Sequence, residues 1–162
     1  MCEYCGCLDV PAIAELTAEH DLVVTLGGQA LRALEAGDLD TAAVRARAIA
    51  AVLAPHTAVE EGALFPAMAV EFGDHVRGLV EEHHLVEAVL AESADGTPVD
   101  PGWPHRLEQG MHVLREHILK EQDGLFPASL AVLDPSDWDH LDEVRLRVGS
   151  AVRDTAGRGI GG

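Results

Sequence analysis

The sequence has few aromatic residues and only three cysteines, and both scarcities limit the class of fold. Aromatic residues make up 4% of the 162 residues, whereas alanine, leucine and valine are abundant. This composition favours closely packed helices over β-sheet. Cys2, Cys5 and Cys7 all lie at the N-terminus, so a disulfide between any two of them cannot join distant parts of the fold.

Positive charge is also scarce. The chain has 11 lysines and arginines against 28 aspartates and glutamates, a net charge of −17 with histidine neutral. This charge repels nucleic acid phosphates and anionic lipids, so we expect neither nucleic acid nor a membrane as a partner. No apolar run is long enough to cross a bilayer, and no signal-peptide layout is present. We therefore expect a soluble, cytoplasmic protein whose length fits one domain.

Apolar residues recur at helical spacing along most of the chain and predict five helices. The expected ranges are about 13–34, 42–67, 76–90, 105–133 and 136–152. Short breaks separate them: Gly37-Asp38, in which Asp38 caps the second helix, Gly73-Asp74, and a loop over 93–104. We expect Ser136 to cap the fifth helix. Mostly short connections predict an all-α fold, an up-down-up-down four-helix bundle with an additional C-terminal helix.

The same pattern predicts how the chain divides. We expect a cysteine-containing N-terminal arm over residues 1–9, the bundle over 10–133, the additional helix over 134–153 and a disordered, glycine-rich tail over 154–162.

An internal repeat relates the two halves of the predicted bundle. The pattern H-x-x-x-E-x-x-x-L-F-P begins at His56 and again at His117. Glu19-His20 likewise matches Glu82-His83. The first and second helices therefore repeat as the third and fourth, which predicts two αα-hairpins about a pseudo-two-fold axis.

Histidines and glutamates interrupt the apolar faces of these helices at one level. A histidine and a glutamate four residues apart lie on the same side of a helix, and a glutamate in a core is costly unless it is paired or binds a metal. His20 and His56 are about 16 and 17 residues from the Gly37-Asp38 turn, or roughly 25 Å along each helix. We expect one metal site built from six residues: His20, His56, Glu60, His83, His117 and Glu121.

The composition of this set indicates how many metals it holds. A single zinc ion needs about four ligands, whereas six ligands with two carboxylates suit a bridged pair of metals. Imidazole and carboxylate together leave iron, zinc and manganese open. A ferritin-like site would need two E-x-x-H pairs, and only Glu81-x-x-His84 occurs; the H-E-x-x-H of metalloproteases is absent from the sequence.

The order H…HxxxE…H…HxxxE, with Leu-Phe-Pro after each HxxxE, resembles the hemerythrin-like, or HHE cation-binding, family over about residues 10–133. The resemblance implies two iron ions in a non-haem, oxygen-bridged di-iron centre. It also implies that the four histidines are terminal ligands, that Glu60 and Glu121 bridge the irons, and that a position stays open for O2, nitric oxide or peroxide.

The sequence departs from the oxygen carriers of that family at two places. Glu87 stands where they have a second third-helix histidine, and HxxxE stands where they have a histidine-to-aspartate spacing. An extra anionic group favours the higher charge state of iron. We therefore expect the ferric form in air, and peroxide or nitric oxide chemistry over stable oxygen carriage.

Two alternative functions stay open: a di-iron enzyme with catalase- or oxidase-like activity, and a sensor of iron, oxygen or redox state.

The remaining candidate residues receive simpler interpretations. We expect His83 rather than His84 to be the third-helix ligand, because His83 shares its face with apolar residues.

We expect the cysteine arm to be redox-linked to the irons without ligating them; inert thiols are the alternative. The other polar residues are expected to be solvated or capping, with Glu87 able to reach a metal: His75, His105, His112, His140, Glu61, Glu81, Glu82 and Glu87.

Overall fold

A computed structural model describes residues 6–153 of the chain. Within them the elements are η2 (Cys7–Asp9), α1 (Pro11–Glu35), α2 (Leu39–Val59), η3 (Glu60–Leu64), α3 (Phe65–Ala91), α4 (Trp103–Lys120), η4 (Glu121–Leu125), α5 (Phe126–Val132) and α6 (Pro135–Val148). The described residues form no strand. The fold is all-α, as predicted.

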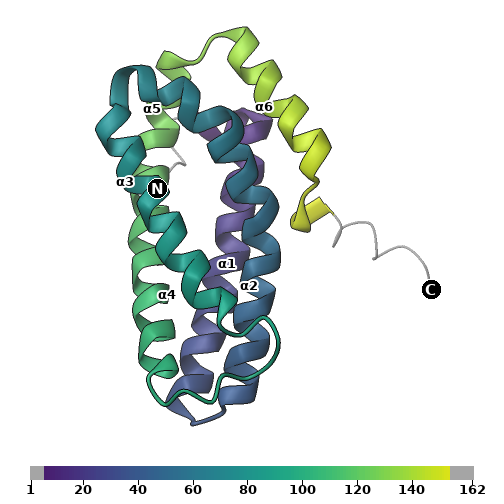
Figure 1. The fold of residues 1–162 in the computed structure, drawn as a ribbon. Helices are drawn as coiled ribbons and strands as arrows, with labels where there is room; N and C mark the ends of the chain where they lie inside the picture. Colours follow the sequence, from purple (N-terminus) through teal and green to yellow (C-terminus); the bar gives the residue numbers. More distant parts are fainter. Residues whose placement is uncertain (1–5, 154–162) are drawn as a thin grey trace, which may run out of the picture.

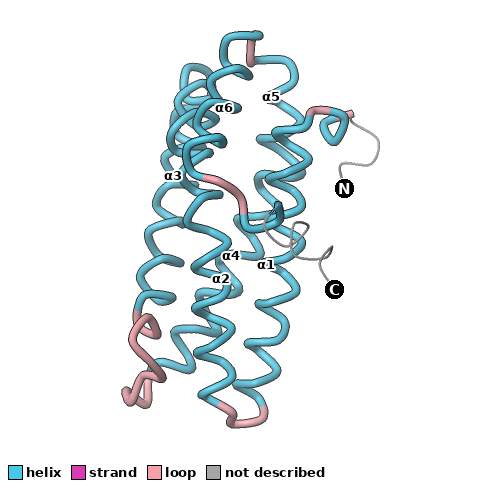
Figure 2. The backbone as a smooth tube through the Cα atoms, turned by 90° about the vertical axis from the view of Figure 1, so that its right-hand side faces the viewer, coloured by secondary structure: helices cyan, strands magenta, loops and turns pink. Residues whose placement is uncertain are grey.

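Four long helical stretches form an up-down-up-down bundle. The turn between α1 and α2 and the loop between α3 and α4 lie at the same end of the molecule (Figure 1). α1 packs against α2 and α4, and α3 packs against α4 and α2. The view from the side shows the same elongated bundle (Figure 2). α6 lies against the outside of the bundle (Figure 1). Hydrophobic faces of all four stretches therefore meet along one axis.

The predicted breaks between helices lie close to the observed ones. Asp38 caps α2 by accepting a hydrogen bond from the backbone N–H of Thr41 at 3.0 Å, which confirms its expected role. The preceding Gly37 adopts a positive φ of 72°, which a residue with a Cβ rarely adopts. Between the second and third stretches, Phe72 leaves helical geometry (φ −123°, ψ 39°) and divides α3 into two arms beside the predicted break at Gly73-Asp74.

The additional C-terminal helix is present as α6, but its predicted cap is wrong. Asp134 caps it through a reciprocal pair of hydrogen bonds with Asp137. Pro135 occupies the first turn, where its missing N–H costs nothing, so Ser136 lies inside the helix. α6 packs across α1, α2 and η3. It buries Leu141 and Val144 there.

The hydrophobic core has two parts, separated along the bundle axis by a polar layer. One part includes Ile13 and Leu16 of α1 together with Phe65 and Phe126. The other begins at Val23 and extends toward the two connections at the opposite end. The polar layer therefore lies between two apolar regions, and α1 crosses it between Leu16 and Val23.

The predicted N-terminal arm and tail lie mostly outside the described residues. Cys2, Cys5 and residues 154–162 belong to that part of the chain. Cys7 is described: it is fully buried in η2 and packs into the first part of the core. Across residues 6–153, no helix has the length and apolar character needed to cross a membrane.

Candidate metal centre

The structure brings all six predicted site residues together in the polar layer. His20 comes from α1, His56 from α2, His83 from α3 and His117 from α4, while Glu60 and Glu121 begin η3 and η4. All six side chains are buried. The neighbouring His84 is exposed, as are the other four histidines interpreted as solvated, so only four of the nine histidines reach the centre.

Each glutamate of the centre opens a π-helical turn. The backbone N–H of Phe65 donates to the carbonyl of Glu60, five residues earlier, and Phe126 donates in the same way to Glu121. A proline follows each phenylalanine and has no N–H to continue the α-helical ladder. Single π turns inside α-helices occur frequently at functional sites. The repeated Leu-Phe-Pro sequence thus marks the same local widening in both halves.

Each glutamate contacts one histidine of its own hairpin and one of the other hairpin. Glu60 Oε1 lies 3.1 Å from His56 Nε2, and Glu60 Oε2 lies 3.2 Å from His83 Nε2. Glu121 Oε1 lies 2.8 Å from His117 Nε2, and Glu121 Oε2 lies 3.0 Å from His20 Nε2. The pseudo-two-fold symmetry predicted from the repeat therefore extends to the polar contacts.

These six side chains form two overlapping groups of candidate metal ligands. One group contains His20 and His56, the other contains His83 and His117, and both contain Glu60 and Glu121. Within each group the four ligand atoms lie within 4.8 Å of one another. Two pairs of histidines thus share two carboxylates, an arrangement that suits two adjacent metal ions bridged by the carboxylates.

The hydrogen bonding of the centre tests whether these residues fit metals. Within the described part of the chain, both carboxylate oxygens of Glu60, both of Glu121, and Nε2 of His20 and His117 are buried without a correctly aligned hydrogen bond. These atoms lie 2.8–3.2 Å from a partner across the centre, but contacts without hydrogen-bond alignment satisfy buried polar atoms only in part. In each group these potential ligand atoms lie within 4.8 Å of one another, close enough to share one metal ion. The residues present therefore fit a metal pair.

In three of the four histidines, the second ring nitrogen, Nδ1, donates a hydrogen bond to a carboxylate outside the centre. Nδ1 of His56 lies 2.9 Å from Glu19, that of His83 lies 2.8 Å from Glu61, and that of His117 lies 2.8 Å from Glu82. Such a contact fixes the proton on Nδ1 and leaves the Nε2 lone pair for a metal. The interpretation of Glu61 and Glu82 as solvated charges is therefore wrong.

This error has a clear cause. Glu61 and Glu82 occupy helix positions that border the buried face, so their carboxylates turn inward although each stays partly exposed. Glu19 is completely buried and comes directly before His20 in the sequence. The repeat contained a usable signal, because Glu19-His20 matches Glu82-His83, and both glutamates of this match serve a histidine of the adjoining helix.

His20 differs from the other three histidines. Its Nδ1 has no aligned hydrogen bond within the described residues. Its ring instead stacks on Phe126, with ring centroids 5.6 Å apart and an interplanar angle of 5°. The symmetry-related stack joins Phe65 and His83 at 5.4 Å. The phenylalanine of each Leu-Phe-Pro therefore holds a histidine ring of the opposite hairpin, in addition to packing in the core.

Charge compensation inside the centre shifts several pKa values of the metal-free protein. Burial disfavours the charged imidazolium of His56, but Glu60 and Glu19 outweigh it and raise the pKa to about 10. Burial likewise opposes the charging of His83, yet Glu60 and Glu61 raise its pKa to about 9. Burial alone would raise the pKa of Glu60, but His56 and His83 hold it well below its ordinary value. Protons on these histidines therefore balance the buried carboxylates when metal is absent.

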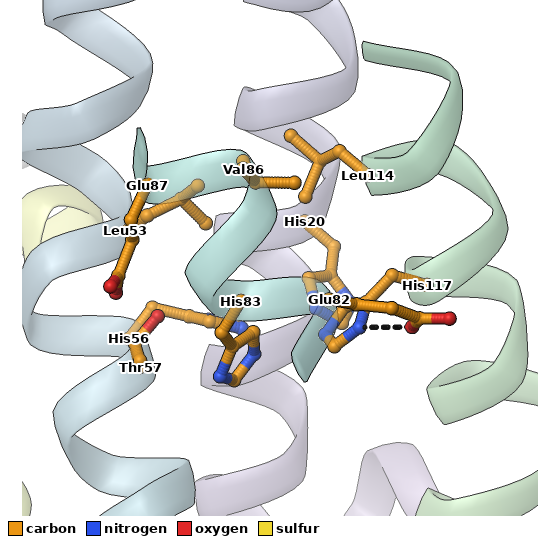
Figure 3. A pocket seen from close by; sticks show the side chains of 10 residues that line it. All are labelled: His20, Leu53, His56, Thr57, Glu82, His83, Val86, Glu87, Leu114 and His117. Atoms are coloured by element: carbon orange, nitrogen blue, oxygen red, sulfur yellow. Dashed lines mark hydrogen bonds and ion pairs between the residues drawn. The ribbon is translucent and has the colours of Figure 1, made fainter. Parts of the chain in front are cut away.

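A small cavity adjoins the four histidines. Its volume is about 10 Å³, enough for roughly one water-sized molecule. Leu53, Val86 and Leu114 line it on one side of the histidine rings (Figure 3). Glu87 also lines this cavity but is exposed, and it belongs to neither group of candidate ligands. The cavity thus offers a small, largely apolar space beside the centre.

Comparison with known protein families identifies a matching domain. The family model of the hemerythrin HHE cation binding domain matches residues 12–129, which include all six residues of the centre and exclude α6. Searches of curated proteins and of solved structures found no match.

Proposed function

Because the chain belongs to the hemerythrin HHE cation-binding domain family, we propose that it is a non-haem di-iron protein that binds O2 or a related small molecule, such as nitric oxide or peroxide. One observation carries the proposal: two pairs of buried histidines share the carboxylates of Glu60 and Glu121. A single ion would leave part of this ligand set unused, whereas two ions use all of it.

The six side chains of the centre would provide ligands for two irons. His20 and His56 would hold one iron, His83 and His117 would hold the other, and both irons would share Glu60 and Glu121. When bound, a pair of irons supplies electrons to, or accepts them from, a small ligand. The carboxylates on Nδ1 of three histidines orient the rings and make their Nε2 atoms stronger donors, which favours the ferric state.

The size and polarity of the cavity support a small ligand. A volume of about 10 Å³ suits a molecule of only a few atoms. The apolar walls formed by Leu53, Val86 and Leu114 favour an uncharged diatomic molecule over bulk water. A net charge of −17 further disfavours nucleic acid and anionic membranes as partners.

Glu87 favours a second candidate function within the same site. Glu87 is one of the residues that line the cavity, and negative charge there stabilises the ferric over the ferrous state. This position supports redox chemistry on peroxide or nitric oxide over long-lived carriage of O2. The protein would then be an enzyme that uses the same six ligands.

A spectroscopic experiment tests the proposal. The protein is loaded with Fe(II) without oxygen, exposed to O2, and then returned to low oxygen. We expect two irons per chain, near-ultraviolet charge-transfer absorption after exposure, and an azide-dependent change in that absorption. Turnover of hydrogen peroxide by the same sample would favour the enzyme, whereas oxygen released intact on lowering its pressure would favour the carrier. A chain that takes up no iron, or absorption that is insensitive to oxygen and azide, would contradict the proposal.

A further inference from the structure

One of the carboxylates that orient the histidines is held by the C-terminal helix. Arg145 of α6 donates from Nη1 to Glu19 Oε1 at 2.8 Å and from Nη2 to Glu19 Oε2 at 2.9 Å. The Glu19 side chain is fully buried, and that of Arg145 is 6% exposed. A two-point contact between guanidinium and carboxylate is both strong and geometrically specific.

The chain after α6 also contacts the carboxylate of Glu19. Arg145 Nη1 also donates to the carbonyl of Gly149 at 3.1 Å. Gly149 adopts a positive φ of 78° and turns the chain back toward α1. Ser150 then donates from its hydroxyl to Glu19 Oε1 at 3.2 Å. Glu19 is thus held by the end of α6 on one side and by His56 on the other.

The other two orienting carboxylates lack such support. The Glu61 side chain is 35% exposed, and within the described chain its ion pair is with His83 alone. Glu82 is 18% exposed and pairs with Lys120, whose side chain is 47% exposed. Exposed pairs of this kind contribute little energy and hold geometry weakly. The two halves of the centre therefore differ in how rigidly their histidines are held.

We propose that Arg145 is a positioning residue of the metal centre: through Glu19 it fixes the ring of His56, so the metal position between His20 and His56 depends on the docking of α6. This inference rests on the proposed function. The family match ends at residue 129, so Arg145 lies outside the matched domain. The C-terminal helix thereby becomes part of the metal site.

The physical basis of this inference is what happens to Glu19 when the guanidinium of Arg145 is removed. A buried carboxylate that loses its paired guanidinium leaves an uncompensated charge. Without the two-point contact to Arg145, the Glu19 side chain is no longer fixed in place, and its hold on Nδ1 of His56 is released. His56 Nε2, which faces Glu60 at 3.1 Å, would then no longer be fixed toward the centre. His83 and His117 would keep their own carboxylates.

Arg145→Met tests the inference, because methionine retains most of the apolar stem and removes the guanidinium. Arg153→Met is the control: Arg153 also joins the C-terminal segment to α1, but it pairs with Glu15 at 2.7 Å, a carboxylate that Arg145 approaches only at 3.6 Å. Fe(II) is titrated without oxygen against a competing chelator. We expect wild type and the control to bind two irons, and Arg145→Met to bind one of the two about 10- to 100-fold more weakly.

Two further measurements separate positioning from general support of the fold. If Arg145 acts through Glu19, the double variant Glu19→Gln/Arg145→Met should lose no more iron affinity than Glu19→Gln alone. In the zinc-loaded protein, long-range ¹H–¹⁵N spectra should show altered ring resonances of His56 in Arg145→Met and unaltered ones of His117. Should Arg145→Met fail to fold, Arg145→Lys retains the charge without the two-point contact and should give a smaller loss at the same position.

Three results would overturn the inference. One is Arg145→Met, or Arg145→Lys in its place, binding both irons as tightly as Arg153→Met. Another is an equal weakening of both positions, which would indicate general destabilisation. The third is a His56 ring signal that does not change. Failure of the wild-type chain to bind two irons would be seen without any change at Arg145, and it would instead contradict the proposed function.

Discussion

At the scale of single residues, each histidine of the centre uses its two ring nitrogens differently. Nε2 faces a shared glutamate, and in three of the four histidines Nδ1 donates to an outer carboxylate. The six inner residues could be predicted from the sequence, because two HxxxE pairs and two further histidines fall on apolar faces at matching levels. Glu61 and Glu82 were misinterpreted because periodicity places them on a border, where only tertiary packing decides which way a long side chain turns.

Adjacent histidines in α3 provide a matched pair of substitutions. His83→Ala removes a buried side chain whose Nε2 faces Glu60, so we expect the iron content to fall by about one ion per chain. His84→Ala removes an exposed side chain and should leave two irons bound. Elemental analysis of the iron content of both variants tests which histidine is the ligand. Full iron in His83→Ala, or loss of iron in His84→Ala alone, would reverse the assignment.

Val86 tests the cavity without touching a ligand. Val86→Ile adds one methylene group beside a space of about 10 Å³ and should fill it. We expect unchanged iron content, weaker azide binding, and a loss of stability of about 1–3 kcal/mol from overpacking. Val52→Ile overpacks another buried position of the core that does not line the cavity, and it should leave azide binding intact. Equal azide affinity in the two variants would place the ligand elsewhere.

The raised pKa values of His56 and His83 predict how pH affects the metal-free protein. Both pKa values, about 10 and about 9, exceed the ordinary value of 6.5. The stabilisation from these charged histidines is therefore fully present below about pH 6.5 and is lost as the pH rises through 9 to 10. We expect the thermal midpoint of the metal-free protein to fall between pH 7 and pH 10.

Metal loading should reverse this dependence, since a bound metal replaces the protons on the histidines. Binding near pH 8 should release protons, so the calorimetric heat of binding should vary with the ionisation heat of the buffer. A heat that is the same in all buffers, or a metal-free midpoint that rises toward pH 10, would contradict these pKa shifts.

At the scale of elements, the sequence predicted the helices better than their irregularities. Apolar spacing placed the bundle helices and α6, and the repeat predicted their pairing. The π turns at η3 and η4 were missed, because a single inserted residue barely changes hydrophobic spacing. Their one visible signal was proline after each Leu-Phe. The role of Arg145 was also missed, since the contact of α6 with Glu19 joins residues 126 positions apart and depends on how the helix docks.

The cap of α6 gives a quantitative prediction at this scale. Asp134→Ala removes the acceptor for the backbone N–H of Asp137 and should lower the free energy of unfolding by about 1 kcal/mol. Ser136→Ala, at the position first expected to cap the helix, should have a smaller effect. Chemical denaturation of the metal-free variants measures both. A larger loss of unfolding free energy in Ser136→Ala than in Asp134→Ala would identify Ser136 as the cap.

At the scale of the whole molecule, the metal centre and the fold depend on each other. The polar layer separates two hydrophobic regions, and four helices each place one histidine in it. The ligands therefore meet only in the folded bundle, and a bound metal pair would in turn join all four helices. α6 adds a further link through Glu19. We expect this chain to respond to loss of metal as one cooperative unit.

The most direct test of the account is an anomalous diffraction map from a crystal of the iron-loaded protein, measured at the iron absorption edge. The account predicts two peaks per chain, one beside His20 and His56 and one beside His83 and His117, both in contact with Glu60 and Glu121. A single peak, or peaks away from these six residues, would contradict it.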